Sequence, residues 1–265
     1  MVTRMHLLGA LGGLFAASAI ALGVALSEPE KNSDMVFVAA GEAVLGGNNF
    51  AEMPGPARHY VKSYWIDRYE VTNAAYEVFV ADTHGDPPLF SDDPLYSKPD
   101  QPVTGVTRFD AEDYCVWRGK RLPTEFEWEK AARGTDGRLY PWGNEEDMSR
   151  AILGGSAPVA VTDQPHDISP YGVVGMAGNV SEWVEEMFVG GPSCLNPDSV
   201  AIQTSTQALT KGDLKFKAYI RGNNFQGLPH MTKLAHHLWD YPDTLAEFVG
   251  FRCARDAKSE QAALQ

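Results

Sequence analysis

The sequence predicts one loop-rich domain that combines short strands with short helices and follows a single transmembrane helix. Three observations support this prediction. An uncharged apolar segment covers residues 5–26. Strand-like segments and then helix-like segments follow it as far as Gly134. Beyond Gly134 the chain is rich in Gly, Pro, Asn and Asp and has no sustained helical period, so we expect mostly loops held by short strands.

The apolar segment reads MHLLGALGGLFAASAIALGVAL and contains no Asp, Glu, Lys or Arg. At about 1.5 Å per residue, a helix of this length spans roughly 33 Å, which is close to the hydrocarbon thickness of a bilayer. Arg4 precedes it, so we expect a single-pass protein with a cytoplasmic N-terminus and a periplasmic or otherwise extracytoplasmic domain. A cleaved signal peptide is the alternative, because residues 19–21 form an A-x-A cleavage site.

Small residues recur at every fourth position of this segment and would line one face of a helix. They are Gly9, Gly13, Ala17, Ala21 and Ala25. Such a face lets another helix approach closely, so it predicts packing against an integral membrane protein. Chance spacing in an Ala- and Gly-rich segment is the alternative.

The composition predicts an ordinary globular core and excludes one class of partner. With 265 residues, 44% of them hydrophobic, the chain can form one large domain. Its formal net charge of -13 would repel phosphate backbones, and no basic cluster offsets that charge, so we expect no nucleic-acid partner. We assign residues 1–33 to an anchor and a short linker, 34–258 to one domain, and 259–265 to a polar tail.

Two strands and three helices are predicted in the first half of the domain. Residues 34–42 contain a short apolar run broken by glycine, and residues 64–72 combine aromatic with β-branched side chains, which is typical of strands. Helices are expected after Thr72, after Asp110 as an N-cap, and after Thr124, which forms a T-x-x-E capping box with Glu127. Gly119 and Gly134 are expected to end the second and third helices.

Six sequence blocks, taken together and in order, resemble the formylglycine-generating enzyme (sulfatase-modifying factor) family. The blocks cover residues 34–42, 64–73, 110–134, 140–144, 175–183 and 250–255. This resemblance implies the family's α+β fold, which is a loop-rich domain related to C-type lectins. It also implies a disulfide between Cys115 and Cys253, for which two buried thiols are the alternative. Cys194 is then left over, either as a buried thiol or as an exposed one that faces a partner.

The family's activity uses two cysteines that bind copper(I), in a segment of pattern GGSxxCxxxxC. Here the cysteine positions fall on Gly227 and Thr232, and the serine position falls on Asn224. Copper(I) prefers soft thiolate ligands, so neither copper nor formylglycine-generating activity is expected. Ser181 stands where the family carries Trp beside its active groove, and Asn179 is the neighbouring degenerate position.

Two metal hypotheses stay open. The family's calcium pattern, N-x-x-G-x-A-x-E, begins here at Gly175, so the Asn ligand is lost, while Gly178, Val180 and Glu182 could still supply oxygen atoms. His230 and His237 could share a transition metal only if the segment between them is helical, and a third ligand would still be needed.

Three functions compete. The first is a non-catalytic, membrane-anchored accessory subunit of a membrane protein complex, in particular a respiratory or other redox assembly. The second is a divergent periplasmic oxidoreductase or maturation enzyme that reuses the family groove. Its candidate residues are Asn179, Glu182, Arg221, Asn224 and His230. The third, a lectin-like binding module, follows from analogy of fold alone.

Overall fold

The computed structural model describes residues 34–47, 56–189 and 216–257, and the chain separates into two units, Met1–Asn32 and Ser33–Gln265. The apolar segment, its small-residue face, Cys194 and the tail 259–265 lie outside the described residues. Within the described ranges, none of the helices combines the length and the hydropathy needed to cross a bilayer.

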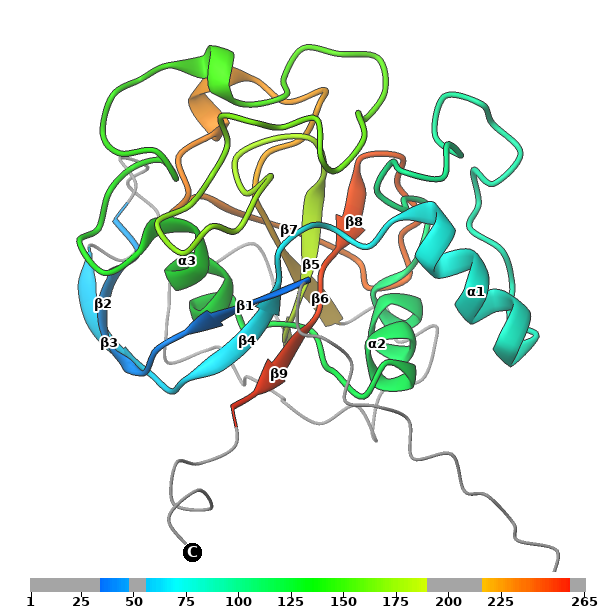
Figure 1. Cartoon of the computed structure of the whole chain (residues 1–265), viewed down its shortest axis with the longest axis horizontal. Coiled ribbons are helices and arrows are strands. Elements are labelled where there is room, and N and C mark those ends of the chain that lie inside the picture. Colours follow the sequence, from blue (N-terminus) through cyan, green and yellow to red (C-terminus); the bar gives the residue numbers. More distant parts are fainter. Residues whose placement is uncertain (1–33, 48–55, 190–215, 258–265) are drawn as a thin grey trace, which may run out of the picture. The chain divides into compact units, whose positions relative to one another are not determined.

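The strands form three sheets (Figure 1). In the central sheet the spatial order is β7 (His237–Asp240), β6 (Phe216–Arg221), β5 (Ser181–Val189) and β8 (Val249–Phe251), with β5 and β8 parallel. The second sheet is antiparallel, in the order β1 (Met35–Val38), β4 (Tyr64–Asp67) and β9 (Ala254–Asp256). The third is the antiparallel pair β2 (Gly41–Leu45) and β3 (Ala57–Val61).

The two predicted strand regions are present, with different bounds. Residues 34–42 contain β1 and the start of β2 rather than one strand. In the second region β4 ends at Asp67, earlier than predicted. At this end of the strand, the backbone oxygens of Asp67 and Arg68 accept hydrogen bonds from the guanidinium of Arg252, and the Arg68 oxygen also accepts the Val174 N–H, so the chain bonds to a side chain and a loop instead of a further strand.

The three predicted helices are confirmed as α1 (Asn73–Thr83), α2 (Arg108–Trp117) and α3 (Glu125–Arg133). Thr124 and Glu127 form the predicted capping box of α3. The predicted cap of α2 was wrong: Thr107 is the N-cap, and Asp110 lies three residues inside the helix as the other half of a capping box. The Asp110 carboxylate accepts the Thr107 N–H at 2.9 Å, so the helix starts one turn earlier than expected.

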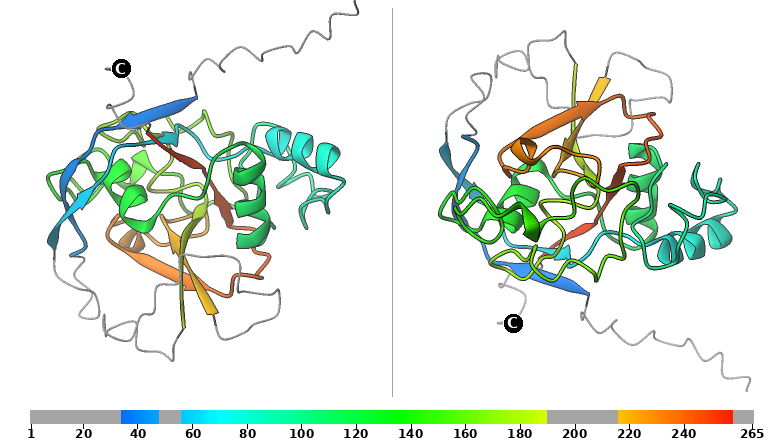
Figure 2. Two further views of the ribbon diagram at one scale, coloured as in Figure 1. Left: turned by 90° about the horizontal axis from the view of Figure 1, so that it is seen from below. Right: turned by 90° about the horizontal axis from the view of Figure 1, so that it is seen from above.

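Two apolar cores lie on opposite faces of the central sheet. Trp183 belongs to the core that contains residues of α1 and α2, whereas its neighbour Val184 belongs to the core that contains Trp128 of α3. Successive side chains of a strand point to opposite faces, so β5 contributes to both cores. Accordingly, α1 and α2 lie on one side of β5 and β6, and α3 lies on the other (Figures 1 and 2).

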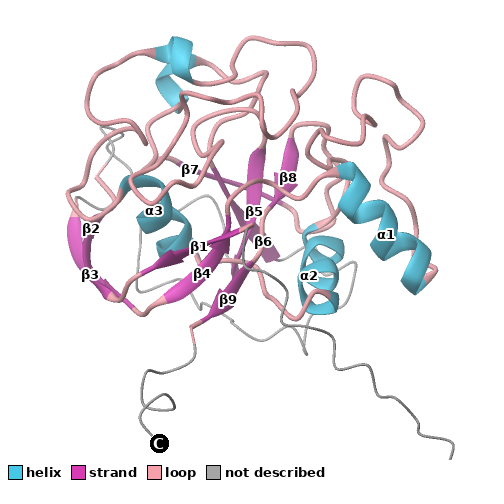
Figure 3. Ribbon diagram, viewed as in Figure 1, coloured by secondary structure: helices cyan, strands magenta, loops and turns pink. Residues whose placement is uncertain are grey.

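The segment from Gly134 to Val180 is mostly loop, as predicted, apart from a single 3-10 turn, η1 (Met148–Arg150) (Figure 3). Hydrogen bonds between distant backbone groups hold it. The N–H of Val174 donates to Arg68 at 2.9 Å, and that of Phe225 donates to Asn179 at 2.8 Å. Such bonds satisfy buried backbone groups that no regular element pairs.

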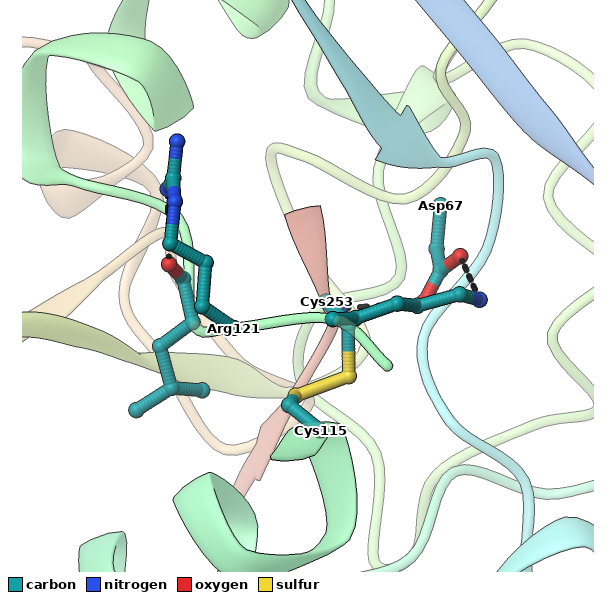
Figure 4. Close-up of a disulfide and its surroundings, with 6 residues drawn as sticks. Asp67, Cys115, Arg121 and Cys253 are labelled. Atoms are coloured by element: carbon teal, nitrogen blue, oxygen red, sulfur yellow. Dashed lines mark hydrogen bonds and ion pairs between the residues drawn. A yellow bond between two sulfur atoms is a disulfide. The ribbon is translucent and has the colours of Figure 1, made fainter. Parts of the chain in front are cut away.

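Cys115 of α2 and Cys253, which directly precedes β9, form a disulfide with Cα atoms 5.7 Å apart (Figure 4). The bond is buried, and two contacts beside it hold the same strand. Arg121 and Ala254 exchange backbone hydrogen bonds of 2.8 and 2.7 Å, and the Asp67 carboxylate accepts the Cys253 N–H at 3.0 Å. The C-terminal strand is therefore fixed covalently to α2 and by hydrogen bonds to β4 and to the connection between α2 and α3.

We expect replacement of both cysteines by serine to destabilise the domain strongly. The bond closes a loop of 138 residues, and the chain-entropy model assigns about 5 kcal/mol to such a loop. For a domain of this size the melting temperature should fall by roughly 10 °C or more, measured by circular dichroism. The single Cys194→Ser variant is the control, and equal melting temperatures of the wild type and the double variant would contradict the assignment.

Candidate functional site

The two positions that the resemblance assigns to catalytic cysteines flank the 3-10 turn η4 (Pro229–Met231), which follows β6: Gly227 precedes the turn and Thr232 is its C-cap. The Asn223 amide fills the space between these positions. Its Nδ2 donates to Thr232 Oγ1 at 2.9 Å and to the carbonyl oxygen of Leu228 at 3.0 Å. Its Oδ1 accepts the Asn224 N–H at 3.0 Å. A Cβ atom added to Gly227 would lie 1.7 Å from this Oδ1, so no larger residue fits at position 227 while Asn223 keeps its place.

The neighbouring polar side chains are also bonded within the protein. Asn224 Nδ2 donates to Ser181 Oγ at 3.0 Å, and the Ser181 hydroxyl donates to the Gly222 oxygen at 3.2 Å. The Asn224 Oδ1 accepts the Gln226 N–H at 3.0 Å. Ser181 and Asn224 are both buried. These groups therefore form a closed network instead of lining an open groove.

Asn179 is buried and adopts a φ of 68°, in the left-handed region that Asn tolerates better than most residues. Its side chain links two segments: Oδ1 accepts the Val159 N–H at 2.9 Å, and Nδ2 donates to Glu70 Oε1 at 3.1 Å. Asn179 therefore holds the irregular loops in place.

Glu182 and Arg252 form a fully buried, two-pronged ion pair. Arg252 Nε and Nη2 donate to the two carboxylate oxygens of Glu182 at 2.8 Å each. Trp128 Nε1 donates to the same carboxylate at 2.8 Å. The negative charge of Glu182 is thus neutralised by a resident guanidinium.

The residues assigned to the calcium pattern do not fit a calcium ion well. Arg252 already occupies the Glu182 carboxylate, and Gly178 packs so closely on Ile152 that an added Cβ would lie 2.7 Å from backbone atoms. The described part of the chain gathers no three His, Cys, Asp or Glu side chains as metal ligands. His230 is exposed, and the side chain of His237 lies outside the described atoms.

Arg221, a candidate catalytic residue, is a fully buried structural cation. Its Nη2 donates to Glu129 Oε2 and to the Leu234 oxygen, both at 2.7 Å. Glu129 also accepts a short hydrogen bond from Arg133, which lies one turn further along α3. Arg221 thereby joins β6 to α3.

Sequence analysis missed two buried acidic residues, Glu70 and Asp167, near the Glu182–Arg252 ion pair. Glu70 accepts hydrogen bonds from Gln164 and Asn179, and Asp167 accepts the Ala177 N–H at 2.7 Å. Burial raises the pKa of Glu70 and of Asp167 to about 7 in each case, and Arg252 only partly counteracts this. Two buried oxygens here, Gln164 Oε1 and Asp167 Oδ1, have no hydrogen-bond partner among the described residues. Glu70 lies in a recognised sequence block, but Gln164 and Asp167 lie in a loop without any motif.

Comparison with known proteins supplies the family context. The model of the sulfatase-modifying factor enzyme 1-like domain family matches residues 23–257. Formylglycine-generating enzyme of Bos taurus is 28% identical over 86% of this chain and 76% of its own length. Inactive C-alpha-formylglycine-generating enzyme 2 of Bos taurus is 32% identical over 59% of this chain and 50% of its own length.

Serine/threonine-protein kinase pkn1 of Chlamydia caviae is 29% identical over 85% of this chain, and the match covers only 38% of the kinase. Among solved structures, PvdO from Pseudomonas aeruginosa superposes with a TM-score of 0.63 at 22% identity, over 84% of this chain and 94% of that one. A structural match at this level of identity shows the fold alone.

We predict that the Asp167→Asn variant changes the pH dependence of stability. The pKa of Asp167 is about 7 in the folded protein against an ordinary value of 3.8, so folding favours the protonated form. This contribution is complete below about pH 4 and is lost as the pH rises towards 7. Asn cannot ionise and can still accept the Ala177 N–H. The free energy of unfolding of the variant relative to wild type should therefore rise by up to about 1.4 kcal/mol per pH unit between pH 5 and 7, then level off.

Denaturant titrations at several pH values measure this difference. Asp163→Asn is the matched control, because Asp163 is exposed in the same loop. Parallel pH curves for Asp167→Asn and wild type would show that Asp167 titrates normally.

Proposed function

Because the chain belongs to the sulfatase-modifying factor enzyme 1-like domain family, we propose that it is a non-catalytic member that acts as a membrane-anchored accessory subunit of a membrane protein complex. One observation carries the non-catalytic part. The Asn223 amide lies between Gly227 and Thr232, where the resemblance places the two copper-binding cysteines. The position offers no thiolate and no space for one.

The buried polar network supports the same proposal. The other candidate catalytic side chains around the segment bond to one another or to the backbone, as described for Ser181, Asn224 and Arg221. A catalytic group must reach a substrate atom at hydrogen-bond distance, and these buried groups are directed at protein partners instead. Calcium is not required by this proposal.

The membrane part of the proposal comes from the sequence. The uncharged segment 5–26 is long enough to span a bilayer, and its small-residue face suits helix packing. We place the domain on the periplasmic side, which agrees with the buried disulfide, because disulfides persist in oxidising compartments. The partner would be an integral membrane subunit, with a respiratory or other redox assembly as the first candidate.

A divergent enzyme is the second candidate function, favoured by the likeness to formylglycine-generating enzyme over most of both chains. A new activity would need a substrate site outside the closed network of Asn223, Asn224 and Ser181. Stoichiometric metal that is lost in a His230→Ala variant would support the enzyme over the accessory subunit.

The filled site predicts how copper(I) binding can be restored. In the Gly227→Cys/Thr232→Cys variant the new Cβ at position 227 collides with Asn223, so we expect little copper(I) binding and a loss of roughly 1–3 kcal/mol of stability. Adding Asn223→Gly removes the collision and should yield one bound copper(I) per chain, measured by competition with a chromogenic chelator. Asn223→Gly alone is the control. Equal binding by the double and triple variants would show that Asn223 does not close the site.

The accessory role predicts a stable complex in native membranes. Purification in mild detergent should recover the chain together with an integral membrane protein, identified by mass spectrometry. Gly9→Leu/Gly13→Leu should abolish this recovery, because leucines on the small-residue face keep the neighbouring helix away. Gly12→Leu/Ala19→Leu is the matched control, since both positions lie off that face. Recovery of the isolated monomer only, or loss in both variants alike, would overturn the role.

A further inference from the structure

An open hollow of about 340 Å³ lies among the loops that precede and follow residue 150, outside the network around Asn223. Its lining combines cationic, hydroxyl and apolar side chains. They include Arg138, Arg150, His166, Ser169, Trp142 and Pro170. No carboxylate is among the lining residues, although the whole chain carries a formal net charge of -13. Two guanidinium groups and no carboxylate thus line the hollow, which favours an anionic ligand over a cationic one.

Arg150 keeps most of its hydrogen-bonding capacity for a ligand. Only its Nε is bonded, at 3.1 Å to Asp147 Oδ2, and the two Nη groups have no acceptor among the described residues. A guanidinium carries five N–H donors in a planar fork, which suits the two oxygens of a carboxylate. Asp147 does not line the hollow, so it orients the Arg150 side chain without occupying the space.

Arg138 has fewer free donors than Arg150, because each of its three guanidinium nitrogens has an acceptor in the protein. Its Nε and Nη2 donate to the two oxygens of Asp136 at 3.0 and 2.8 Å, and Nη1 lies 3.4 Å from the Pro141 oxygen. Asp136 is also absent from the lining. His166 is exposed and has no hydrogen-bond partner in the described part of the chain, so its ring nitrogens are available.

Ser169 and Trp142 also line the hollow and add a hydroxyl group and an apolar surface. Buried Ser169 accepts the N–H groups of Tyr171 and Val173 at 3.3 and 3.1 Å, which leaves the hydroxyl hydrogen to donate. The Trp142 indole stacks on Tyr140 with ring centroids 5.3 Å apart. Trp142 Nε1 already donates to a backbone oxygen at 2.9 Å, so the indole offers the hollow mainly its carbon surface.

We propose that this hollow binds a small organic acid, with its carboxylate on Arg150, His166 and Ser169 and its apolar body against Trp142 and the neighbouring prolines. The Nη groups of Arg150 and the His166 ring lack partners within the described protein, and Trp142 and the prolines place apolar surface beside them. Sites for small organic ligands combine a few polar groups with apolar surface in this way. The site does not depend on the accessory role or on the family's cysteine positions. Binding of the organic acid would therefore not require a membrane partner.

The test uses the full-length protein in detergent, with sodium benzoate and inorganic phosphate as probes. Calorimetric titration at constant ionic strength should show saturable binding of benzoate, and Arg150→Gln should weaken it by about tenfold, as expected for a lost charge-assisted hydrogen bond. Trp142→Leu should weaken benzoate binding as well, because the apolar wall is reduced. Phosphate should bind more weakly than benzoate, because it cannot use that wall.

Arg58→Gln is the matched control. Arg58 is also an exposed arginine in an ion pair, with Glu42, but it lies on the β2–β3 sheet and does not line the hollow. This variant should leave benzoate binding unchanged. No saturable binding to the wild type, equal binding by Arg150→Gln, or an equal loss in Arg58→Gln would overturn the proposal. Stronger binding of phosphate than of benzoate would overturn the organic-acid assignment. A melting curve for Arg150→Gln that matches the wild type shows that the half-exposed side chain was removed without loss of the fold.

Discussion

The buried pair between Glu182 and Arg252 is the contact on which the rest of the domain depends. Both side chains are fully buried, and charges in that position are stable only when they are paired and hydrogen-bonded. Arg252 meets this condition by donating to the Glu182 carboxylate and to backbone oxygens of Asp67, Arg68 and Val174. One guanidinium thus joins the central sheet, the end of β4 and the irregular loop. Removal of either partner would leave an uncompensated charge in the core.

The geometry of the central sheet explains why this pair can form. Glu182 lies opposite Gly250 in the parallel β5–β8 ladder, and Arg252 follows two residues later on the same face. A Cβ atom at position 250 would lie 2.7 Å from the Val103 oxygen, so glycine allows β8 to pack closely against the backbone at Val103. The next residue, Cys253, is bonded to α2. Strand β8, the ion pair and the disulfide therefore follow one another within five residues, 249–253, and hold both cores to the sheet.

Local sequence signals predicted the three helices and the loop character of residues 134–180, but they located only two of the strand regions. The Thr124 and Glu127 capping box is a contact between residues three apart, so the sequence shows both partners together. Asp110 was expected to be the N-cap of α2, but it is the third residue of the helix and completes a capping box with Thr107, which the sequence analysis did not consider. The pairing of Cys115 with Cys253 came from the family resemblance and not from spacing. The segment 5–26 and Cys194 stay predictions.

The site depends on contacts between residues that are far apart or that have no characteristic motif. Glu70 and Gln164 are 94 positions apart, and no local pattern indicates that they meet in the interior. Asn223 lies in the segment that corresponds to the family's cysteine pattern, but the sequence shows only that positions 227 and 232 carry no cysteine. The side chain that fills the gap becomes visible only when the turn before η4 is folded. Sequence reasoning could therefore predict that these positions carry no thiolate, but it could not predict that the Asn223 amide lies between them.

The buried guanidinium groups and the guanidinium of Arg150 at the surface hollow differ in how many of their donors are bonded within the protein. Inside, each guanidinium is opposed by carboxylates at short range: Arg252 by Glu182, and Arg221 by Glu129. Their donors are directed at protein oxygens, so these ion pairs stabilise the interior and do not present a cation to a ligand. Arg150 differs because it is partly exposed and keeps both Nη groups without an acceptor in the described structure. Among the described residues, the guanidinium donors that can meet a small molecule therefore lie at the surface loops around Arg150 and not in the buried ion pairs.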